Sequence, residues 1–599
     1  MPTLQFKGKS VIETYAYTVP HHRLELVPDL SLLGKGEKPN LEGNLIIEGD
    51  NLLALKALLP THAGRVKCIY IDPPYNTGNE GWVYNDNLTQ PQFKEWIGQT
   101  VGKEGEDACR HDKWCCMMYP RLMLLRELLR EDGVILASID DFEMHRMRLL
   151  LDEVFGESNL LANLVWEKGR KNDARFFSVG HEYMSIYAKS KDRLRELGTV
   201  WRESKPGAVD MWEEYLKIRG KHKKDDAAVE AALRKWMDDL PEKHPAKKLR
   251  RYLHIDENGP WRDRDISWPG GGGPRYNVVH PKTKKPCQVP ERGWGFSSPD
   301  EMQRQIDLDL VVFREDHTKP PFRKAHLHPI AAETEDNGDI ETDDEGDTDE
   351  VGVQVMPSVI YKQSQPAVRY LRNLLGAKVF ENPKDYEVLA RLFRYLTEAD
   401  DIILDSFAGS GSTAQGVLEA NKSDNQQRRF VLVQQKYDSK ANEKDEFNIC
   451  QKVTIERVKR ALKKEKYVGQ FTVATVGEPL FNQYGLFNKK LPKWDDLAKY
   501  IFYTETSRQI EAAKMKPESG FVGSQEGAGG TSYYLFYTPD AKKSLPMSHD
   551  QLNAILKKDK NRNWVIYCEK IWVQPDELRK FERENNKKIR TMQIPFQLR

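Results

Sequence analysis

The chain has few cysteines and no long apolar run. Seven cysteines among 599 residues are too few for a disulfide scaffold of the kind that holds small secreted proteins together. No apolar stretch approaches the roughly 20 residues that a helix needs to cross a bilayer, and residues 1–7 lack the apolar core of a signal peptide. These absences argue against a secreted scaffold and a membrane-spanning protein, so we expect a cytoplasmic protein with no membrane partner.

A paired zinc motif is also missing. Cys109, His111, Cys115 and Cys116 lie close together in the sequence, but their spacing matches no CxxC pair, and adjacent cysteines chelate one ion awkwardly. Zinc binding is the alternative, whereas buried thiols and a loop histidine are the interpretation that we favour. We therefore expect no metal site.

The charge is nearly balanced overall but unevenly distributed. The net charge is +1, from 92 basic and 91 acidic residues, and residues 333–350 hold eleven of the acidic ones with no Lys or Arg. The rest of the chain then has 92 basic residues against 80 acidic ones, a surplus that favours binding to a polyanion. We expect the acidic run to be a solvated, disordered loop, with mimicry of nucleic acid or autoinhibition as the alternative.

Strands and helices alternate in two separate parts of the chain. Apolar periodicity predicts strands at 45–48, 67–71 and 134–139 with helices at 52–59, 121–130 and 141–155, and later helices at 386–396 and 414–421 with strands at 402–404 and 430–433. This alternation predicts an α/β fold with one doubly wound, mostly parallel sheet that is assembled from both parts. Ligands would then bind at the carboxyl ends of its strands.

The tetrapeptide Asp72-Pro73-Pro74-Tyr75 directly follows one of these strands. Two consecutive prolines lock φ and supply no backbone N–H, so the turn is stiff. Such a turn can grip an amino group, because Asp72 and the Pro73 carbonyl accept its hydrogens while Tyr75 stacks on the ring that carries it. On composition alone, a plain turn is the alternative.

A glycine-rich loop follows the strand at 402–404. Its sequence, from 405 to 413, reads Asp-Ser-Phe-Ala-Gly-Ser-Gly-Ser-Thr, and a helical run begins at Ala414. Glycines between a strand and a helix let a ligand approach the backbone closely. Ala414 stands at the third glycine position of the dinucleotide pattern GxGxxG and no lysine follows the glycines, which excludes that pattern and a Walker A loop.

Together, and in this order, the two motifs resemble the β-class amino-methyltransferases of DNA, in which a DPPY motif precedes an FxGxG loop. The resemblance is closest to the modification subunits of type III restriction–modification systems. Further segments that fit the family are 47–51, 69–78, 84–87, 131–135, 138–141, 380–384 and 456–458. The resemblance implies the S-adenosylmethionine-dependent methyltransferase fold with a circularly permuted motif order.

The resemblance also implies roles for single residues. The implied catalytic residues are Asp72, Pro73, Pro74 and Tyr75. The implied cofactor-binding residues are Asp50, Asn382, Lys384, Asp405, Phe407, Gly409 and Gly411. An acidic residue commonly closes the second cofactor strand and holds the ribose hydroxyls, but here Gln434 and Gln435 follow Val433. Because a Gln amide can still hydrogen-bond a hydroxyl, the cofactor assignment stands while the ribose ligand stays open.

The implied reaction is methyl transfer from S-adenosylmethionine to the N6 amino group of adenine in duplex DNA, after the base has flipped out of the helix. In the family, Asp at the first motif position goes with adenine and Ser with N4 of cytosine. The alternatives are a non-catalytic DNA-recognition subunit, an N4-cytosine methyltransferase, and a methyltransferase for RNA or protein amides. The intact motif at 72–75 argues against a non-catalytic recognition subunit, and the long insertion between the motifs disfavours a methyltransferase for RNA or protein amides.

We expect five segments along the chain: an N-terminal extension (1–40), the first half of the methyltransferase domain (41–160), a target-recognition domain (161–355), the second half of the methyltransferase domain (356–467) and a C-terminal α/β domain (468–599). The middle segment joins a basic helical tract, 219–251, to glycine-rich loops that carry Arg, Lys and Trp. This combination of basic and aromatic residues on glycine-rich loops suits contact with double-stranded DNA. The alternative is a scaffold insertion whose tryptophans belong to its core.

The chain lacks a Walker A lysine loop and a recognisable cluster of nuclease carboxylates. By itself it is expected neither to hydrolyse ATP nor to cut DNA. The resemblance therefore implies a homodimer that binds a separate ATP-dependent helicase–nuclease subunit, with the C-terminal segment as a docking surface.

Overall fold

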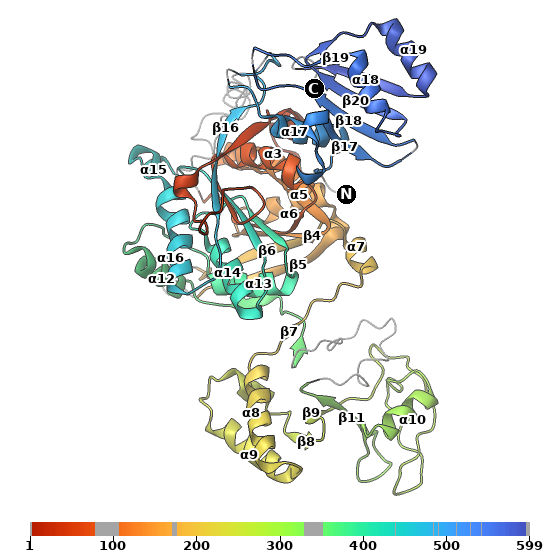
Figure 1. The fold of residues 1–599 in the computed structure, drawn as a ribbon. Coiled ribbons are helices and arrows are strands. Elements are labelled where there is room, and N and C mark those ends of the chain that lie inside the picture. Colours follow the sequence, from red (N-terminus) through yellow and green to blue (C-terminus); the bar gives the residue numbers. More distant parts are fainter. Residues whose placement is uncertain are drawn as a thin grey trace. The chain divides into compact units, whose positions relative to one another are not determined.

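The computed structural model describes residues 3–77, 107–169, 176–328 and 352–594, apart from residues 438, 483, 489, 511, 528 and 541. The chain forms two compact units: the first contains residues 1–199 and 358–599, and the second contains residues 200–357 (Figure 1). The acidic run at 333–350 and the family segment at 84–87 lie outside the described residues. No helix within the described ranges is long and apolar enough to cross a bilayer.

A ten-stranded sheet organises the first unit. Its strand order is β1-β16-β2-β15-β14-β3-β4-β6-β5-β13. The bounds in that order are His22–Leu26, Thr472–Pro479, Leu45–Glu48, Arg429–Gln434, Ile402–Asp405, Val66–Ile71, Leu129–Ile139, His181–Ala188, Leu160–Glu167 and Val359–Tyr361. Neighbours from β16 to β4 run parallel, whereas β1, β6 and β5 pair antiparallel with their inner neighbours. The sheet is therefore mostly parallel, as the sequence predicts.

Helices cover both faces of this sheet. Helices α3 (Asn51–His62), α5 (Asp107–Leu128) and α6 (Met144–Phe155) share one apolar cluster with strand residues such as Ile69 and Leu404. Side chains alternate between faces along a strand, so Ile403, which is fully buried but lies outside that cluster, points to the other face. There α14 (Ser412–Asp424) contacts β15, and α13 (Tyr386–Leu396) packs against α14. The doubly wound arrangement is confirmed.

Shorter helices complete the unit. Helices α1 (Lys9–Ile12) and α2 (Tyr15–Thr18) bury Ile12, Tyr15 and Ala16 against the cluster that contains α3 and α5. The N-terminal extension is therefore part of the core of the first unit. Among the described residues, this unit also contains α7 (Lys191–Glu196), α12 (Gln365–Leu375), α15 (Lys440–Lys444) and α16 (Glu456–Lys464).

Of the boundaries that differ from those predicted by the sequence, two follow from strand pairing. The helix predicted at 121–130 ends at Leu128, because Leu129 pairs with Val66 and opens strand β4. The predicted target-recognition domain starts at residue 161, but β5 and β6 still extend the sheet, and the second unit begins at Val200. Strand pairing decides both boundaries, and it is a tertiary property that apolar periodicity does not encode.

The second unit contains a helical half and a sheet half. Helices α8 (Ala208–His222) and α9 (Asp226–Asp239) bury an apolar core, and a sheet of order β10-β11-β9-β8 lies beside α10 (Pro299–Asp307). These strands are Val311–Val312, Phe322–His326, Gly259–Arg264 and His254–Asp256, and the pair β7 (Glu203–Ser204) and β12 (Val353–Gln354) joins the two ends of the unit. Trp294 is fully buried, and Trp212 and Trp236 pack against the helical core. Much of the tryptophan content is thus structural.

The C-terminal domain is a smaller α/β sheet within the first unit. Its strand order is β17-β18-β20-β22, with bounds Phe521–Gln525, Thr531–Phe536, Asn563–Cys568 and Lys588–Gln593, and β18, β20 and β22 run parallel. Helices α17 (Trp494–Thr506), α18 (His549–Leu556) and α19 (Pro575–Asn585) accompany it, and β19 (Pro546–Met547) pairs with β21 (Lys570–Ile571). Helix α17 contacts α3 and so connects this domain to the catalytic sheet.

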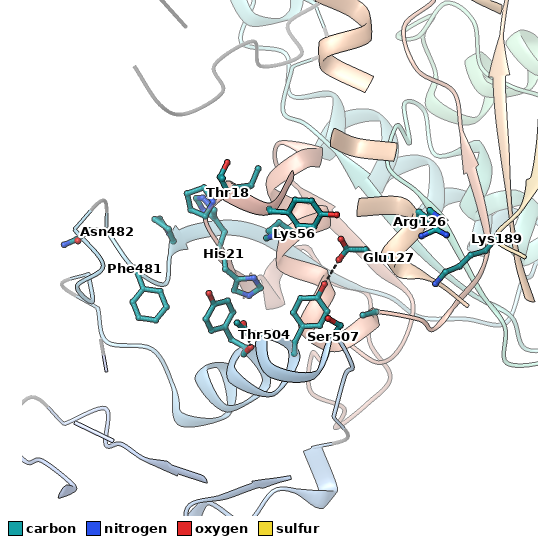
Figure 2. Close-up of a pocket in the computed structure, with 18 of the residues that line it drawn as sticks. Thr18, His21, Lys56, Arg126, Glu127, Lys189, Phe481, Asn482, Thr504 and Ser507 are labelled. Atoms are coloured by element: carbon teal, nitrogen blue, oxygen red, sulfur yellow. Dashed lines mark hydrogen bonds between the residues drawn. The ribbon is translucent and has the colours of Figure 1, made fainter. Parts of the chain in front are cut away.

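A cavity of about 1330 Å³ lies at that junction (Figure 2). Phe481 and Thr504 line it from the C-terminal part of the chain, and Lys56 and Arg126 line it from α3 and α5. At its wall the Tyr503 hydroxyl donates to the Glu127 carboxylate at 2.5 Å. Side chains therefore fill this junction only partly.

Candidate active site

The predicted site residues come from strands whose carboxyl ends lie at one edge of the sheet. Asp50 follows β2, Asp405 ends β14, and Asp72 follows β3. Because β2, β15, β14 and β3 are consecutive and parallel, these ends are neighbours. Two halves of the chain separated by more than 300 residues thus contribute to one edge, where ligands of open α/β sheets bind.

The turn after β3 is held from several sides. The Trp114 indole nitrogen donates to the Pro74 carbonyl at 2.8 Å. Asn76 has a left-handed backbone conformation with φ of 58°, and its side-chain amide donates to the buried Glu143 carboxylate at 2.5 Å. These contacts add to the stiffness of Pro73 and Pro74, so Asp72 is presented by a rigid turn.

One oxygen of the Asp72 carboxylate receives both of its contacts. The Tyr75 hydroxyl and the Lys384 ammonium each lie 2.9 Å from Oδ1. The Asp72 side chain remains 25% exposed. Among the described residues, no donor is placed on Oδ2, so this oxygen is open to a ligand.

Lys384 connects the turn after β3 to the glycine loop. Its backbone carbonyl accepts a hydrogen bond of 2.9 Å from the Ser412 hydroxyl at the start of α14. Its buried ammonium reaches Asp72, the Tyr75 hydroxyl and Glu182. The opposing carboxylates outweigh the effect of burial and raise the pKa of Lys384 well above its usual value. Lys384 is therefore a permanent cation at this point.

Glu182 and Lys168 belong to the same cluster, and the sequence motifs did not point to them. Glu182, on β6, is 3% exposed, and its Oε2 lies 2.7 Å from Lys384, 2.5 Å from Lys168 and 2.8 Å from the Tyr75 hydroxyl. Burial raises the pKa of Glu182, but the two lysines outweigh it and bring the pKa below its usual value. One feature of the sequence could have indicated Glu182: it is a glutamate near the start of the largely apolar strand at 181–188.

The Tyr75 hydroxyl lies between two carboxylates. Burial, Asp72 and Glu182 raise the pKa of this phenol well above its ordinary value, so the phenol stays neutral. A neutral phenol has one hydrogen, so it can donate to Asp72 or to Glu182 but not to both at once. Its aromatic ring is half-buried beside Lys384, whose ammonium lies 5.0 Å from the ring centroid.

The glycine loop is held by its own side chains. Asp405 accepts from the Thr413 hydroxyl at 2.5 Å and from the Phe407 amide at 2.9 Å, and burial raises its pKa to about 7. Gly409 and Gly411 have φ of 51° and 79°, which favour glycine. The Gln434 side chain accepts from the Gly409 amide at 2.7 Å. Hydrogen bonds to Asp405 and Gln434 therefore hold the loop in its conformation.

Polar atoms without hydrogen-bond partners remain near this loop. Among the described residues, buried Asp50 Oδ2, Ser406 Oγ and Gln435 Nε2 find no such partner, although Asp50 Oδ2 forms an ion pair with Arg121 at 3.6 Å. The other Asp50 oxygen accepts from the Leu53 amide and caps α3. Since buried polar groups normally find partners, these atoms mark a place where a polar ligand fits. Asn382, by contrast, is exposed.

The cysteines considered for zinc have other surroundings. Cys115 and Cys116 are buried within α5, and His111 Nδ1 lies 2.5 Å from the Glu143 carboxylate, which accepts its hydrogen. The side chain of Cys109 lies outside the described residues. His111 and Asn76 thus share Glu143, which connects α5 to the turn after β3.

Comparison with known proteins identifies the family. A family model described as DNA methylase matches residues 66–437. The Mod subunit of the type III restriction-modification enzyme EcoP15I from Escherichia coli is 31% identical over 486 residues, which cover 78% of this chain and 70% of that protein. The EcoPI Mod subunit of Escherichia phage P1 is 30% identical over 72% of this chain and 63% of its own length. The StyLTI Mod subunit of Salmonella typhimurium is 27% identical over 83% of this chain and 68% of its own length. These matches confirm the resemblance read from the sequence, and the chain belongs to the DNA methylase family.

Proposed function

We propose that the chain is a site-specific DNA methyltransferase that acts on the N6 amino group of adenine in duplex DNA. The observation that carries this proposal is the Asp72 carboxylate at the carboxyl edge of the sheet: Tyr75 and Lys384 contact its Oδ1, and no described residue donates to its Oδ2. An acceptor fixed in this way suits an amino group that must be oriented before it reacts.

The chemistry follows from the weakness of the nucleophile. The lone pair of an exocyclic amine is delocalised into its base, so the nitrogen attacks only when that conjugation is reduced. Asp72 Oδ2 and the Pro73 carbonyl would accept the two amino hydrogens. These hydrogen bonds favour the geometry in which the nitrogen lone pair is no longer conjugated with the ring. This stabilisation grows as positive charge develops on the nitrogen, so it acts in the transition state. The base must leave the duplex for this contact.

The residues around the glycine loop fit S-adenosylmethionine, which supplies an electrophilic methyl group on a sulfonium when bound. Asp50 Oδ2, Ser406 Oγ and Gln435 Nε2 offer an acceptor, a hydroxyl and a donor that make no hydrogen bond with the part of the chain that the structure describes. They match a ligand with an amino group and hydroxyls. Because Gln434 is engaged by Gly409, we assign the ribose hydroxyls to Gln435. Gly409, Gly411 and Phe407 would enclose the remainder of the cofactor.

We propose that the second unit, residues 200–357, reads the DNA sequence. A loop in it supports this assignment: Lys282, Lys284 and Lys285 are exposed on a turn whose backbone amides at 282 and 283 donate to the buried His280 ring at 3.2 Å. A rigid loop that presents several cations suits phosphate contacts, which position a protein on DNA.

We further propose that the chain works with other subunits in the cytoplasm, where cellular DNA is available to it. The similar proteins are named as Mod subunits of restriction-modification enzymes, which supports a partner subunit, and we infer an ATP-dependent helicase–nuclease and a homodimer of this chain. Light scattering of the pure protein, with and without DNA, should return twice the monomer mass of 69.3 kDa. A monomer under both conditions contradicts the homodimer.

The function is tested by expressing the chain in a host that lacks adenine methylation. Nucleoside analysis of the host DNA should show N6-methyladenine, and the Asp72→Ala variant should show none while it still binds S-adenosylmethionine in calorimetry. N4-methylcytosine in place of N6-methyladenine would show that the base assignment is wrong. Cofactor binding without any methylated base would favour a recognition subunit.

A further inference from the structure

We propose that Glu182 is a positioning residue for methyl transfer: it holds the Lys384 ammonium in place on one oxygen of Asp72, so that the other oxygen faces the amino group of the base. Lys168 is the counter-ion that keeps this cluster neutral. The proposal rests on the proposed function, and it assigns roles to two residues that lie outside both sequence motifs.

The first step is the geometry of the Lys384 ammonium. It has three hydrogens, and the structure provides three acceptors: Asp72 Oδ1 at 2.9 Å, Glu182 Oε2 at 2.7 Å and the Tyr75 hydroxyl oxygen. With all three donors engaged, the ammonium cannot rotate toward Asp72 Oδ2. Glu182 is thus one of three points that fix the position of Lys384.

The second step concerns how strongly Asp72 can accept a hydrogen bond. A cation that pairs with Asp72 alone would neutralise it and compete with the amino group for its oxygens. Glu182 shares this cation at a shorter distance than Asp72 does. Because both Glu182 and Lys384 are buried, water does not screen this competition. Glu182 therefore preserves the acceptor strength of Asp72.

The third step is the charge balance of the cluster. Asp72 and Glu182 contribute two negative charges, and Lys384 and Lys168 contribute two positive ones. The Lys168 ammonium lies 2.5 Å from Glu182 Oε2 and 4.9 Å from the Trp166 ring centroid. If Lys168 is removed, Glu182 pairs with Lys384 alone and draws it away from Asp72. If Glu182 is removed, two lysines face a single carboxylate.

Lys168 also gives the cluster a pH limit. The charged groups that face it are Glu182 on β6, Lys384 before α13 and Asp72 after β3. Burial and Lys384 lower the pKa of Lys168 to about 8, although Glu182 and Asp72 oppose this shift. Lys168 is charged below that pH and neutral above it, so the balanced state disappears as the pH rises through about 8. The rate constant for methyl transfer should therefore fall as the pH rises above about 8.

The test uses the full chain, S-adenosylmethionine and unmethylated DNA, with three variants: Glu182→Gln, Lys168→Met and the double variant. Glu182→Gln should lower kcat on the order of 10- to 100-fold, as loss of a supporting contact typically does, while KM for DNA and cofactor affinity change less than about twofold. Lys168→Met should lower kcat less and remove the fall in rate above pH 8. The double variant restores neutrality, so its kcat should exceed that of Glu182→Gln several-fold.

Glu131→Gln is the matched control, because Glu131 is an exposed carboxylate of the same sheet that pairs with Lys189. It should leave kcat and its pH profile unchanged. If the wild type methylates adenine and Glu182→Gln keeps its full kcat, the positioning role is refuted while the proposed function stands. If Glu182→Gln does not fold, the neutral double variant carries the test, because it also lacks the Glu182 carboxylate, and a double variant with the full kcat of the wild type refutes the positioning role. A wild type that methylates nothing refutes the proposed function itself.

Discussion

Replacing Lys384 by Met should destabilise the catalytic sheet, and the loss of stability should depend on pH. The substitution keeps an unbranched side chain of similar length but removes the ammonium that bridges Asp72 and Glu182. Removing one partner of a buried ion pair typically costs about 3–5 kcal/mol. Since Lys168 stays beside Glu182, we expect the lower end of that range, about 3 kcal/mol, which is roughly 150-fold in the equilibrium for opening this region.

The pH dependence follows from Glu182. In the native protein Lys384 and Lys168 outweigh burial and lower the pKa of Glu182. Without Lys384 burial prevails, and the pKa of Glu182 rises above its value in the unfolded chain, about 4.3. An acid whose folded pKa is raised destabilises the protein when ionised, and this penalty disappears as the pH falls through the raised pKa. The difference between variant and wild type should therefore be large near neutral pH and shrink toward about pH 5.

Hydrogen exchange read by mass spectrometry measures this effect locally, which suits a chain of several domains whose unfolding is not two-state. Peptides from β3 and β6 should lose protection at about pH 7.5 and recover part of it at about pH 5.5, after correction for intrinsic exchange rates. Lys362→Met is the control, because Lys362 pairs with Glu387 near the surface, and such pairs contribute about 1 kcal/mol or less. An equal loss of protection at both pH values would refute the reasoning, as would a Lys384→Met/Glu182→Gln variant no better protected than Lys384→Met.

Three further predictions concern DNA recognition. Replacing Lys282, Lys284 and Lys285 by Ala should weaken binding to all DNA sequences alike. The slope of log affinity against log salt concentration should become shallower by about 0.9 for each phosphate that is no longer neutralised. An unchanged slope in fluorescence anisotropy titrations contradicts a phosphate role. Exchanging residues 200–357 for those of a relative should change the DNA sequence that is methylated. Long-read methylation profiling that returns the original motif would contradict the assignment of DNA recognition to this unit. Deleting residues 333–350, which hold eleven acidic residues, should leave the melting temperature nearly unchanged and DNA affinity equal or higher; a large drop in melting temperature would show a structural role.

Much of the fold follows from sequence periodicity alone. The predicted strand at 45–48 and the predicted helix at 386–396 have the observed bounds. Both motifs lie at the carboxyl ends of parallel strands, as the strand–helix alternation requires. These features depend on local patterns, namely apolar runs, caps such as Asp385 and stiff turns, so one sequence is enough to predict them.

The electrostatic cluster could not be predicted in the same way. Glu182 reaches Tyr75 only because β6 inserts antiparallel between β4 and β5, and no local pattern specifies that pairing. Gln434 looked like a cofactor ligand by its position, but its side chain holds the Gly409 amide. In both cases the partner lies far away in the sequence, so the role of the side chain depends on the tertiary fold.

The strand order of the catalytic sheet has a consequence for synthesis on the ribosome. Strands β2 and β3 are consecutive along the chain, yet β15 and β14 lie between them in the sheet. The N-terminal half thus emerges with unpaired edges on two apolar strands, and their partners follow only after residues 402–434 have been made. At about 5–20 residues per second the wait is of the order of tens of seconds. During this interval the nascent chain is exposed to mispairing and aggregation, so a chaperone that shields these edges should increase the yield of active enzyme.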